Sequence, residues 1–244
     1  MSEPAPFDPA RHALFLDFDG TLAPLVADPG AVPVTPALVS RLGAIARETN
    51  GALAIVSGRR IADLDRFLAP LDFAAAGVHG LERRARPGGR VESIASPEDL
   101  DDVRMRLRDG VAAEPRLALE DKGTALVLHY RTAPDLAEAA ARLMAEAVTD
   151  REGLSVLHGD MIVEVHPAGM DKGVAVAAFM AEAPFAGRVP VYLGDDRTDE
   201  FALGVVEERG GLAVKVGRHP SVARHRLADV SAVHRWLGVA EASR

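Results

Sequence analysis

Two aspartates separated by one residue, Asp17 and Asp19, follow an apolar run and lead directly into Gly20-Thr21. A short apolar run that stops at a glycine is typical of a buried strand that ends in a loop. Side chains alternate along a strand, so the two carboxylates would share one face while Phe18 returns to the core. Open α/β sheets bind their ligands at the carboxyl ends of their strands. The segment therefore predicts a sheet of this kind with an acidic site at its edge.

The close spacing of the two carboxylates raises the question of what neutralises them. Like charges repel, so a cation or a shared proton is expected beside Asp17 and Asp19. A calcium-binding EF-hand loop does not fit, because its sixth position, a glycine, would be Leu22 and its twelfth, a glutamate, would be Asp28. Taken alone, the hexapeptide also allows an Asp-Gly turn without chemistry.

Composition narrows the class of partner. The 244 residues allow one large domain or two modest ones, and a formal net charge of -8 argues against nucleic acid and anionic membranes. We therefore expect a small-molecule partner, with the oligomeric state left open. No run approaches the roughly 20 apolar residues of a membrane helix, and residues 1–12 do not resemble a secretory leader, so we expect a cytoplasmic protein. The absence of cysteine excludes disulfides and thiolate chemistry.

The basic residues are divided unevenly. The chain has 25 arginines but only three lysines, Lys122, Lys172 and Lys215. Arginine evidently supplies the general surface charge. Because the compact ammonium and the planar guanidinium suit different geometries, each lysine is a candidate for a specific role.

Strands and helices alternate at both ends of the chain. A helix is expected from Thr35-Pro36, and the apolar strand 52–56 ends in Ser57-Gly58-Arg59 before another helix. The alternation resumes after Pro167, with strands at 189–193 and 212–216. This order predicts an α/β fold with a doubly wound, mostly parallel, Rossmann-like sheet and right-handed crossovers.

The middle of the chain has a different pattern. It opens with an Arg-, Gly- and Pro-rich stretch, 83–90, and continues with helices beside successive hairpins, as in a small α+β domain with an antiparallel sheet. The sequence therefore predicts a core domain of residues 1–82 and 168–244 that is interrupted by an inserted domain of residues 83–167.

Three further loops carry groups that suit a phosphate. Ser57-Gly58 offers a hydroxyl and an open backbone N–H, Lys172 offers a positive charge at a helix start, and Asp195-Asp196 offers oxygen ligands for magnesium. Each alone also fits a turn, a solvated lysine or acids at a helix start. Together they are more specific, because hydrolysis of a phosphate monoester requires a nucleophile, an acid, a cation and oxyanion donors at once.

These four segments, in this order, resemble the four motifs of the haloacid dehalogenase superfamily across the full chain: Asp17 to Thr21, Ser57 to Arg59, Asp171 to Gly173, and Gly194 to Asp196. The resemblance implies the haloacid dehalogenase fold, with the inserted α+β domain as a cap over the substrate. It also implies that the protein is a phosphotransferase or phosphatase.

The resemblance assigns a role to each motif. Asp17 would be the nucleophile that forms an aspartyl-phosphate, and Asp19 would protonate the leaving oxygen and then activate water. Ser57 and Lys172 would hold the phosphoryl oxygens. Mg²⁺ would be bound by Asp17, by Asp195 and by the main-chain carbonyl of Asp19. Two further acids, Asp196 and Asp199, would support these ligands.

Segments 77–82, 120–122, 163–167 and 194–200 look like those of the trehalose-6-phosphate phosphatases. This narrower resemblance implies hydrolysis of trehalose 6-phosphate to trehalose and phosphate. A disaccharide presents many hydroxyls, which carboxylates and an amine can bind. The expected substrate contacts are Gly20, Thr21, Gly58, Arg59, His79, Glu120, Lys122 and Glu164. For Arg59 a surface role, and for His79 a hydrogen bond to a loop carbonyl, fit equally well.

Other functions fit parts of this pattern. Sucrose-phosphate phosphatase, mannosylphosphoglycerate phosphatase and phosphomannomutase have related caps. A phosphoryl-accepting signalling module also combines acids, magnesium and a lysine on a doubly wound sheet, but it is about half this length and needs no cap. An acid two residues after the nucleophile favours turnover over storage of the phosphoryl group. A sugar-binding protein without catalysis would lack the cation site.

Overall fold

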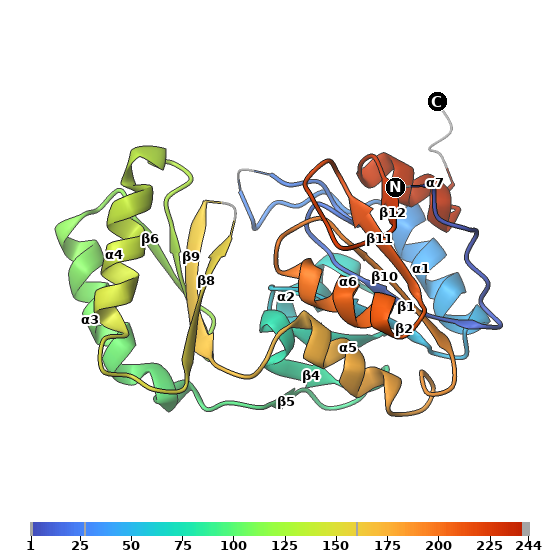
Figure 1. Cartoon of the computed structure of the whole chain (residues 1–244), viewed down its shortest axis with the longest axis horizontal. Coiled ribbons are helices and arrows are strands. Elements are labelled where there is room, and N and C mark those ends of the chain that lie inside the picture. Colours follow the sequence, from blue (N-terminus) through green and yellow to red (C-terminus); the bar gives the residue numbers. More distant parts are fainter. Residues whose placement is uncertain (1, 27, 160, 241–244) are drawn as a thin grey trace. The chain divides into compact units, whose positions relative to one another are not determined.

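The computed structural model describes residues 2–26, 28–159 and 161–240 (Figure 1). The chain forms two compact units, a core unit of Met1–Glu92 with Asp171–Arg244 and a cap unit of Ser93–Met170. One unit is thus inserted in the other. Within the described ranges, no helix combines the length and hydropathy needed to cross a membrane.

The core unit is built on an eight-stranded sheet with the strand order β12-β11-β10-β1-β2-β3-β4-β5. Neighbouring strands from β12 to β3 are parallel, and β4 is antiparallel to β3. The strands, in chain order, are β1 His12–Leu16, β2 Leu53–Val56, β3 Ala74–Gly77, β4 Glu82–Arg84, β5 Glu92–Ser93, β10 Val189–Gly194, β11 Leu212–Val216 and β12 His225–Leu227. The chain winds outward from β1 in one direction and from β10 in the other, so the predicted doubly wound, mostly parallel sheet is confirmed.

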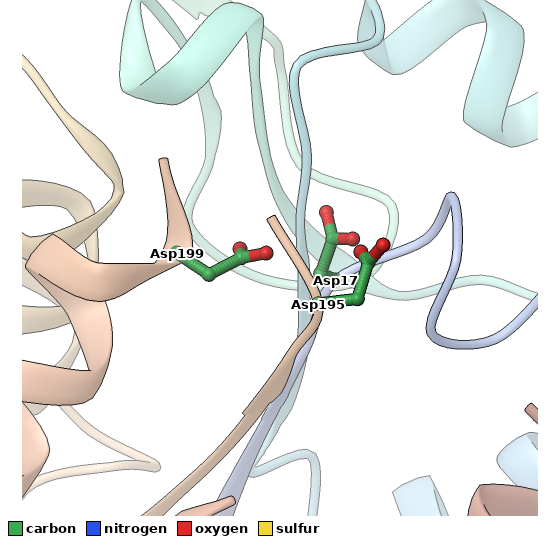
Figure 2. Close-up of side chains that lie close together, drawn as sticks. All are labelled: Asp17, Asp195 and Asp199. Carbon is green, nitrogen blue, oxygen red and sulfur yellow. The ribbon is translucent and has the colours of Figure 1, made fainter. Parts of the chain in front are cut away.

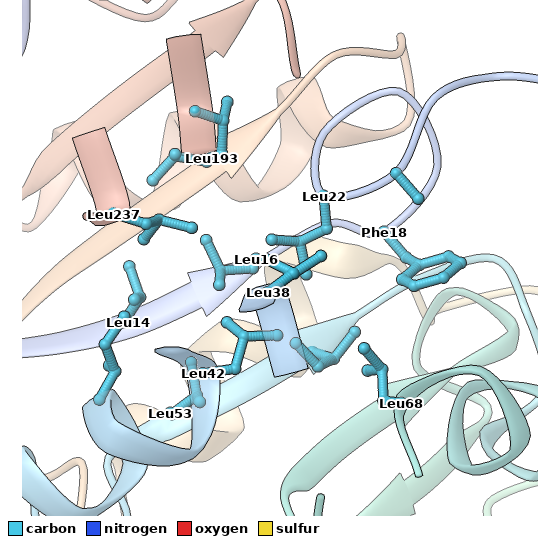
Figure 3. Close-up of a cluster of buried hydrophobic side chains, with 14 of the residues drawn as sticks. Leu14, Leu16, Phe18, Leu22, Leu38, Leu42, Leu53, Leu68, Leu193 and Leu237 are labelled. Carbon is cyan, nitrogen blue, oxygen red and sulfur yellow. The ribbon is translucent and has the colours of Figure 1, made fainter. Parts of the chain in front are cut away.

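Helices cover both faces of this sheet. They are α1 Pro36–Glu48, α2 Ile61–Leu68, α5 Lys172–Met180, α6 Asp199–Glu208 and α7 Val230–Leu237. Leu14 and Leu16 of β1 pack in one buried cluster with residues of α1, α2 and α7 (Figure 3), whereas Phe15 packs in another with residues of α5 and α6. Phe18 lies in the same cluster as Leu14 and Leu16, as the alternation predicts. Asp17 lies on the same face as Phe15, on the side where α5 and α6 begin.

The first predicted domain boundary is wrong. Residues 83–92, which the sequence assigns to the inserted domain, belong to the core unit and supply β4 and β5 at the edge of its sheet. Arg84 is buried there, where its guanidinium binds the Phe73 carbonyl and Asp65. The Arg-, Gly- and Pro-rich stretch therefore forms the end of β4 and most of the loop that leads to the edge strand β5. Its composition resembles that of a linker because such a loop also needs turn residues.

The second predicted boundary is also early, because residues 168–170 belong to the cap unit. The backbone N–H of Ala168 donates to the carbonyl of Gly153 at 2.8 Å, which extends the contact between β8 and β9 past the end of the strands. The unit therefore ends just before Asp171, the residue that caps α5.

The cap unit is an antiparallel sheet with two helices on one face (Figure 1). Its strand order is β6-β7-β9-β8, with β6 Ala118–Asp121, β7 Leu126–His129, β8 Leu154–Gly159 and β9 Ile162–Pro167. Its helices are α3 Asp101–Ala113 and α4 Ala137–Ala147, and its 3₁₀ turns include η2 Pro97–Leu100 and η3 Pro134–Leu136. A further 3₁₀ turn, η1 Val78–Gly80, lies in the core unit. Alternate residues of β7 and β9, such as Leu126 and Val163, pack on α3 and α4. The predicted α+β character is confirmed.

The core of the larger unit depends on side chains such as Leu42 of α1, which is fully buried. We expect Leu42→Ala to lower the free energy of unfolding by about 2–5 kcal/mol, since it leaves a cavity. Leu25→Ala is the matched control, because Leu25 is 55% exposed and its truncation should change stability by less than ~0.5 kcal/mol. Urea unfolding measures both, and equal values for the two variants would contradict this account of the core.

Candidate active site

The four sequence motifs meet at the carboxyl edge of the core sheet. Asp17 follows β1 and Asp195 follows β10, and these parallel neighbours pair Leu16 with Leu193. Their carboxylates therefore lie side by side, with Asp199 pointing toward them from the start of α6 (Figure 2). One carboxylate oxygen from each of the three aspartates lies within 4.8 Å of the others.

Lys172 joins two of these aspartates. It is the first residue of α5, which begins there because the side chain of Asp171 accepts a hydrogen bond from the N–H of Val174. The Lys172 ammonium donates to Asp17 Oδ1 at 2.8 Å and to Asp199 Oδ1 at 2.7 Å, and all three side chains are at most 5% exposed. A buried lysine of this kind is retained only with charged partners, and it holds Asp17 in one orientation.

Both carboxylate oxygens of Asp199 accept hydrogen bonds from protein donors. Its Oδ1 also accepts from the hydroxyl of Tyr192 at 2.6 Å, and its Oδ2 accepts from the backbone N–H of Asp196 at 2.9 Å. Gly194 makes room for it, because a Cβ at that position would overlap the Asp199 carboxylate. The geometry therefore favours Asp199 as a support for Lys172 and for the Asp195-Asp196 loop, with Asp17 and Asp195 left to bind a ligand.

The site carries more negative charge than its lysine can neutralise. Three carboxylates and one ammonium have a formal charge of -2. Burial, and after it the charge of Asp199, raise the pKa of Asp17 well above its usual range, and the same two causes raise the pKa of Asp195 to about 7. Burial opposes the charge of Lys172, but Asp17 and Asp199 together raise its pKa. A divalent cation would restore the balance.

The conformation of Gly20 indicates that the residues present fit such a cation. It adopts φ +77°, in the left-handed region, and a Cβ there would overlap the carboxylate of Asp195. The bare glycine thus provides the space in which Asp195 approaches Asp17. Thr21 lies beside them, with its hydroxyl 3.5 Å from Asp195 Oδ1. Hard oxygen donors around an uncompensated charge fit Mg²⁺ or a similar ion. The structure places Gly20 and Thr21, which the sequence suggests as substrate contacts, against Asp195.

The Ser57-Gly58 loop is held by a strained turn at Val78 and His79, which directly follows β3. Ser57 follows β2 and is 1% exposed. The backbone N–H of His79 donates to the carbonyl of Ser57, and that of Val78 donates to the carbonyl of Arg59. Val78 and His79 have φ values of +47° and +55°, which are costly for a β-branched residue above all. The strain brings the His79 ring against Gly58, where a Cβ would lie 2.7 Å from it.

The Arg59 side chain binds Asp19, a contact that the sequence did not predict. Its Nε donates to Asp19 Oδ2 at 2.6 Å and one terminal nitrogen donates to Asp19 Oδ1 at 2.7 Å, while the other binds the carbonyl of Pro29. The guanidinium lies 4.9 Å from the Phe67 ring centroid and 5.5 Å from that of Phe18. Arg59 therefore orients Asp19. Sequence reasoning missed this pair, because no spacing rule connects residue 59 with residue 19.

The three candidate sugar ligands gather on one face of the cap sheet. Glu120 and Glu164 both pair with Val127, one on each side, so they lie in one row across β6, β7 and β9. The Lys122 ammonium lies 3.2 Å from Glu164 Oε2, and Glu164 is 1% exposed. This is the face opposite α3 and α4.

His129 lies on the same face of the cap sheet, two residues along β7 from this row, and sequence reasoning missed it. Its Nε2 lies 2.8 Å from Glu120 Oε2. Burial opposes the charge of Glu120, but His129 and then Lys122 lower its pKa overall. The signal was available, because alternation along β7 places His129 on the same face as Val127.

An aspartate bound by a buried lysine, an adjacent acidic loop and a doubly wound sheet with an inserted unit are the features expected of the haloacid dehalogenase fold. The C-terminal domain of a trehalose-6-phosphate phosphatase from C. albicans superposes with a TM-score of 0.82 at 22% identity, over 95% of this chain and 94% of that one. A phosphatase of the same superfamily from Bacteroides thetaiotaomicron, BT1666, superposes with a TM-score of 0.61 at 17% identity, over 95% and 97%. At these identities the likeness shows the fold.

Sequence comparisons define the family. The trehalose-phosphatase family model matches residues 15–233. Trehalose-6-phosphate phosphatase of Escherichia coli (strain K12) is 41% identical over 97% of this chain and 90% of that protein. A probable trehalose-phosphate phosphatase of Sinorhizobium fredii is 40% identical over 93% and 85%. The chain belongs to the trehalose-phosphatase family, which confirms the predicted superfamily and enzyme class.

The raised pKa of Asp195 makes cation binding depend on pH. With its pKa raised to about 7, this carboxyl should take up a proton increasingly as the pH falls below that value, and a cation would have to displace the proton. We expect the affinity for Mg²⁺ to fall by about tenfold per pH unit below ~7 and to level off above ~8. Calorimetric titration in buffers of different ionisation enthalpy measures both the affinity and the released protons. The same affinity at about pH 6 and about pH 8 would contradict this assignment.

Proposed function

We propose that the protein hydrolyses trehalose 6-phosphate to trehalose and phosphate, with Mg²⁺ and through an aspartyl-phosphate on Asp17. One observation carries the proposal: the Asp17 carboxylate is held by Lys172 at 2.8 Å and lies beside Asp195, in a member of the trehalose-phosphatase family. When bound, Mg²⁺ would be held by Asp17, Asp195 and the carbonyl of Asp19, and would neutralise charge on the transferring phosphoryl group.

Asp17 is suited to attack phosphorus because its position is already fixed. Lys172 binds one carboxylate oxygen and favours the ionised form. The same ammonium, with the hydroxyl of Ser57 and the N–H of Gly58, would hold the phosphoryl oxygens as charge develops on them. The P–O bond to the sugar breaks as the bond to Asp17 forms.

Asp19 is suited to move the protons. It would donate a proton to the sugar oxygen as that oxygen leaves, and then take one from the water that attacks the aspartyl-phosphate. Its side chain is bound by Arg59 at both oxygens. Asp19 would give up at least one of these bonds when it carries a proton, and its main-chain carbonyl would be the cation ligand.

The cap unit supplies a reason to favour a disaccharide. Glu120, Lys122 and Glu164 offer two acceptors and one charged donor on one face of the cap sheet, and hydroxyl groups of a sugar can satisfy all three. A site built from such groups rejects analogues that leave them unpaired. The cytoplasmic location and the absence of nucleic-acid and membrane partners stay predictions from the sequence.

The substrate is tested directly by phosphate release. We expect trehalose 6-phosphate to be hydrolysed with a kcat/KM at least about 100-fold above that of glucose 6-phosphate or sucrose 6-phosphate, because only the first would present hydroxyl groups that pair with all three proposed sugar ligands. Release should stop when the cation is removed with a chelator and return with Mg²⁺. Comparable rates on all three esters would reject the assignment of trehalose 6-phosphate.

The nucleophile is tested by Asp17→Asn, which keeps the shape of the side chain and removes its charge. We expect kcat to fall by at least ~10³-fold with the fold intact. Asp63→Asn is the matched control, since Asp63 lies on α2 with an exposed arginine partner, and its activity should be unchanged. Activity of Asp17→Asn close to that of the unsubstituted protein would rule out Asp17 as the attacking group.

The cap assignment predicts a split between two substrates. Glu120→Ala and Glu164→Ala should each lower kcat/KM for trehalose 6-phosphate by at least ~10-fold and leave the hydrolysis of p-nitrophenyl phosphate nearly unchanged, since that ester has no sugar hydroxyls. Glu138→Ala, at an exposed position on α4, is the control and should change neither. Equal losses on both substrates would mean that these residues do not select the sugar.

A further inference from the structure

Lys215 is the one lysine to which the proposed chemistry gives no role. It lies on β11, between Val214 and Val216, and is 1% exposed. Lysine is almost never fully buried unless it is paired, and an apolar residue would pack in a central strand without desolvating a charge. Its presence in a chain with only three lysines therefore requires a specific reason.

The position of Lys215 brings its ammonium to the acidic loop. Lys215 pairs with Gly194, the last residue of β10, so its side chain starts beside the strand end that carries Asp195. The ammonium donates to the main-chain carbonyl of Asp196 at 3.0 Å and to Glu200 Oε1 at 3.0 Å. No substrate role is needed to explain these contacts.

The bond to Asp196 completes the restraint of one short loop. The N–H of Asp196 is already bound by Asp199, at 2.9 Å, and its C=O is bound by Lys215. Both polar main-chain groups of the residue that follows Asp195 are thus tied to buried side chains. With these two bonds made, the backbone that carries the Asp195 carboxylate has one orientation.

Glu200 anchors Lys215 in turn. Its Oε1 accepts from the ammonium, and its Oε2 accepts from the Ser221 hydroxyl at 3.1 Å and from the Val222 N–H at 2.9 Å. Glu200 therefore neutralises the buried charge and connects it to the segment after β11. A continuous set of contacts runs from that segment, through Glu200 and Lys215, to Asp196.

We propose that Lys215 is a positioning residue for the divalent cation: it pins the carbonyl of Asp196 and so holds the Asp195 carboxylate in its binding position before the cation arrives. Affinity rises when a ligand is oriented in advance, because less freedom is lost on binding. The inference rests on the proposed function only in taking Asp195 as a cation ligand. It does not depend on the identity of the sugar.

The test is direct binding of Mg²⁺ to the full chain, measured by calorimetry without substrate. Lys215→Met keeps the length of the side chain and removes the donor. We expect its affinity for Mg²⁺ to fall by about 10–100-fold, as is typical when a group that supports a metal ligand is lost. Arg224→Ala is the matched control, because Arg224 is a 79% exposed basic residue just beyond the same segment, and its affinity should stay unchanged.

Two further variants separate positioning from a general loss of stability. Leu42→Ala destabilises the core away from the site and should bind Mg²⁺ as the unsubstituted protein does. Glu200→Gln weakens the anchor of Lys215 and should lower the affinity by about 3–10-fold, and adding it to Lys215→Met should cause little further loss, because both act through one contact. If Lys215→Met does not fold, the affinity of Glu200→Gln for Mg²⁺ still tests whether the contacts of Lys215 support cation binding.

The outcomes are distinct. A folded Lys215→Met that binds Mg²⁺ as tightly as the unsubstituted protein would overturn the role of Lys215 and leave the proposed function standing. So would an unchanged affinity in Glu200→Gln if that variant alone can be prepared. Absence of Mg²⁺ binding in the unsubstituted protein would overturn the cation site itself, and with it this inference.

Discussion

The rest of the site depends on one buried ammonium shared by two carboxylates. Lys172 lies between Asp17 and Asp199, 2.8 Å from one and 2.7 Å from the other. Removing Lys172 would leave two buried carboxylates without a positive partner, which is far more costly than losing a surface pair. The bond therefore fixes the start of α5, the start of α6 and the end of β1 relative to one another. The nucleophile is oriented by the same contact that joins these elements.

The excess negative charge follows from that arrangement. Lys172 supplies one positive charge among three carboxylates, so the charges of Asp17 and Asp195 are only partly balanced by it. Two glycines make this crowding possible, since a Cβ on Gly20 or Gly194 would overlap a carboxylate. Repulsion between these carboxylates therefore destabilises the folded protein at this edge of the sheet. A divalent cation bound there would offset that repulsion. Membership of the trehalose-phosphatase family and the grouping of Asp17, Asp195 and Lys172 both support the proposed transfer of a phosphoryl group at this site.

Much of this could be predicted from the sequence because the relevant rules are local. The apolar run before Asp17, the cap and first turn of α1, and the alternation of strands and helices each follow from residues close in the chain. The parallel order then places Asp17 and Asp195 at one edge, since parallel strands end on the same side. The predicted boundary at residue 83 was wrong because it depends on contacts between residues that are not neighbours in the chain. Arg84 is buried by contacts with Phe73 and Asp65, which no local pattern indicates.

The sequence by itself determined the class of fold, the inserted α+β unit and the set of loops that carry the chemistry, because strand and helix periods and turn residues are encoded over a few positions. Only the tertiary structure decided which side chains pair. Arg59 binds Asp19, His129 binds Glu120, and Lys215 reaches the carbonyl of Asp196. Each of these contacts depends on side-chain direction and burial, which arise when distant elements pack and which spacing along the chain does not specify.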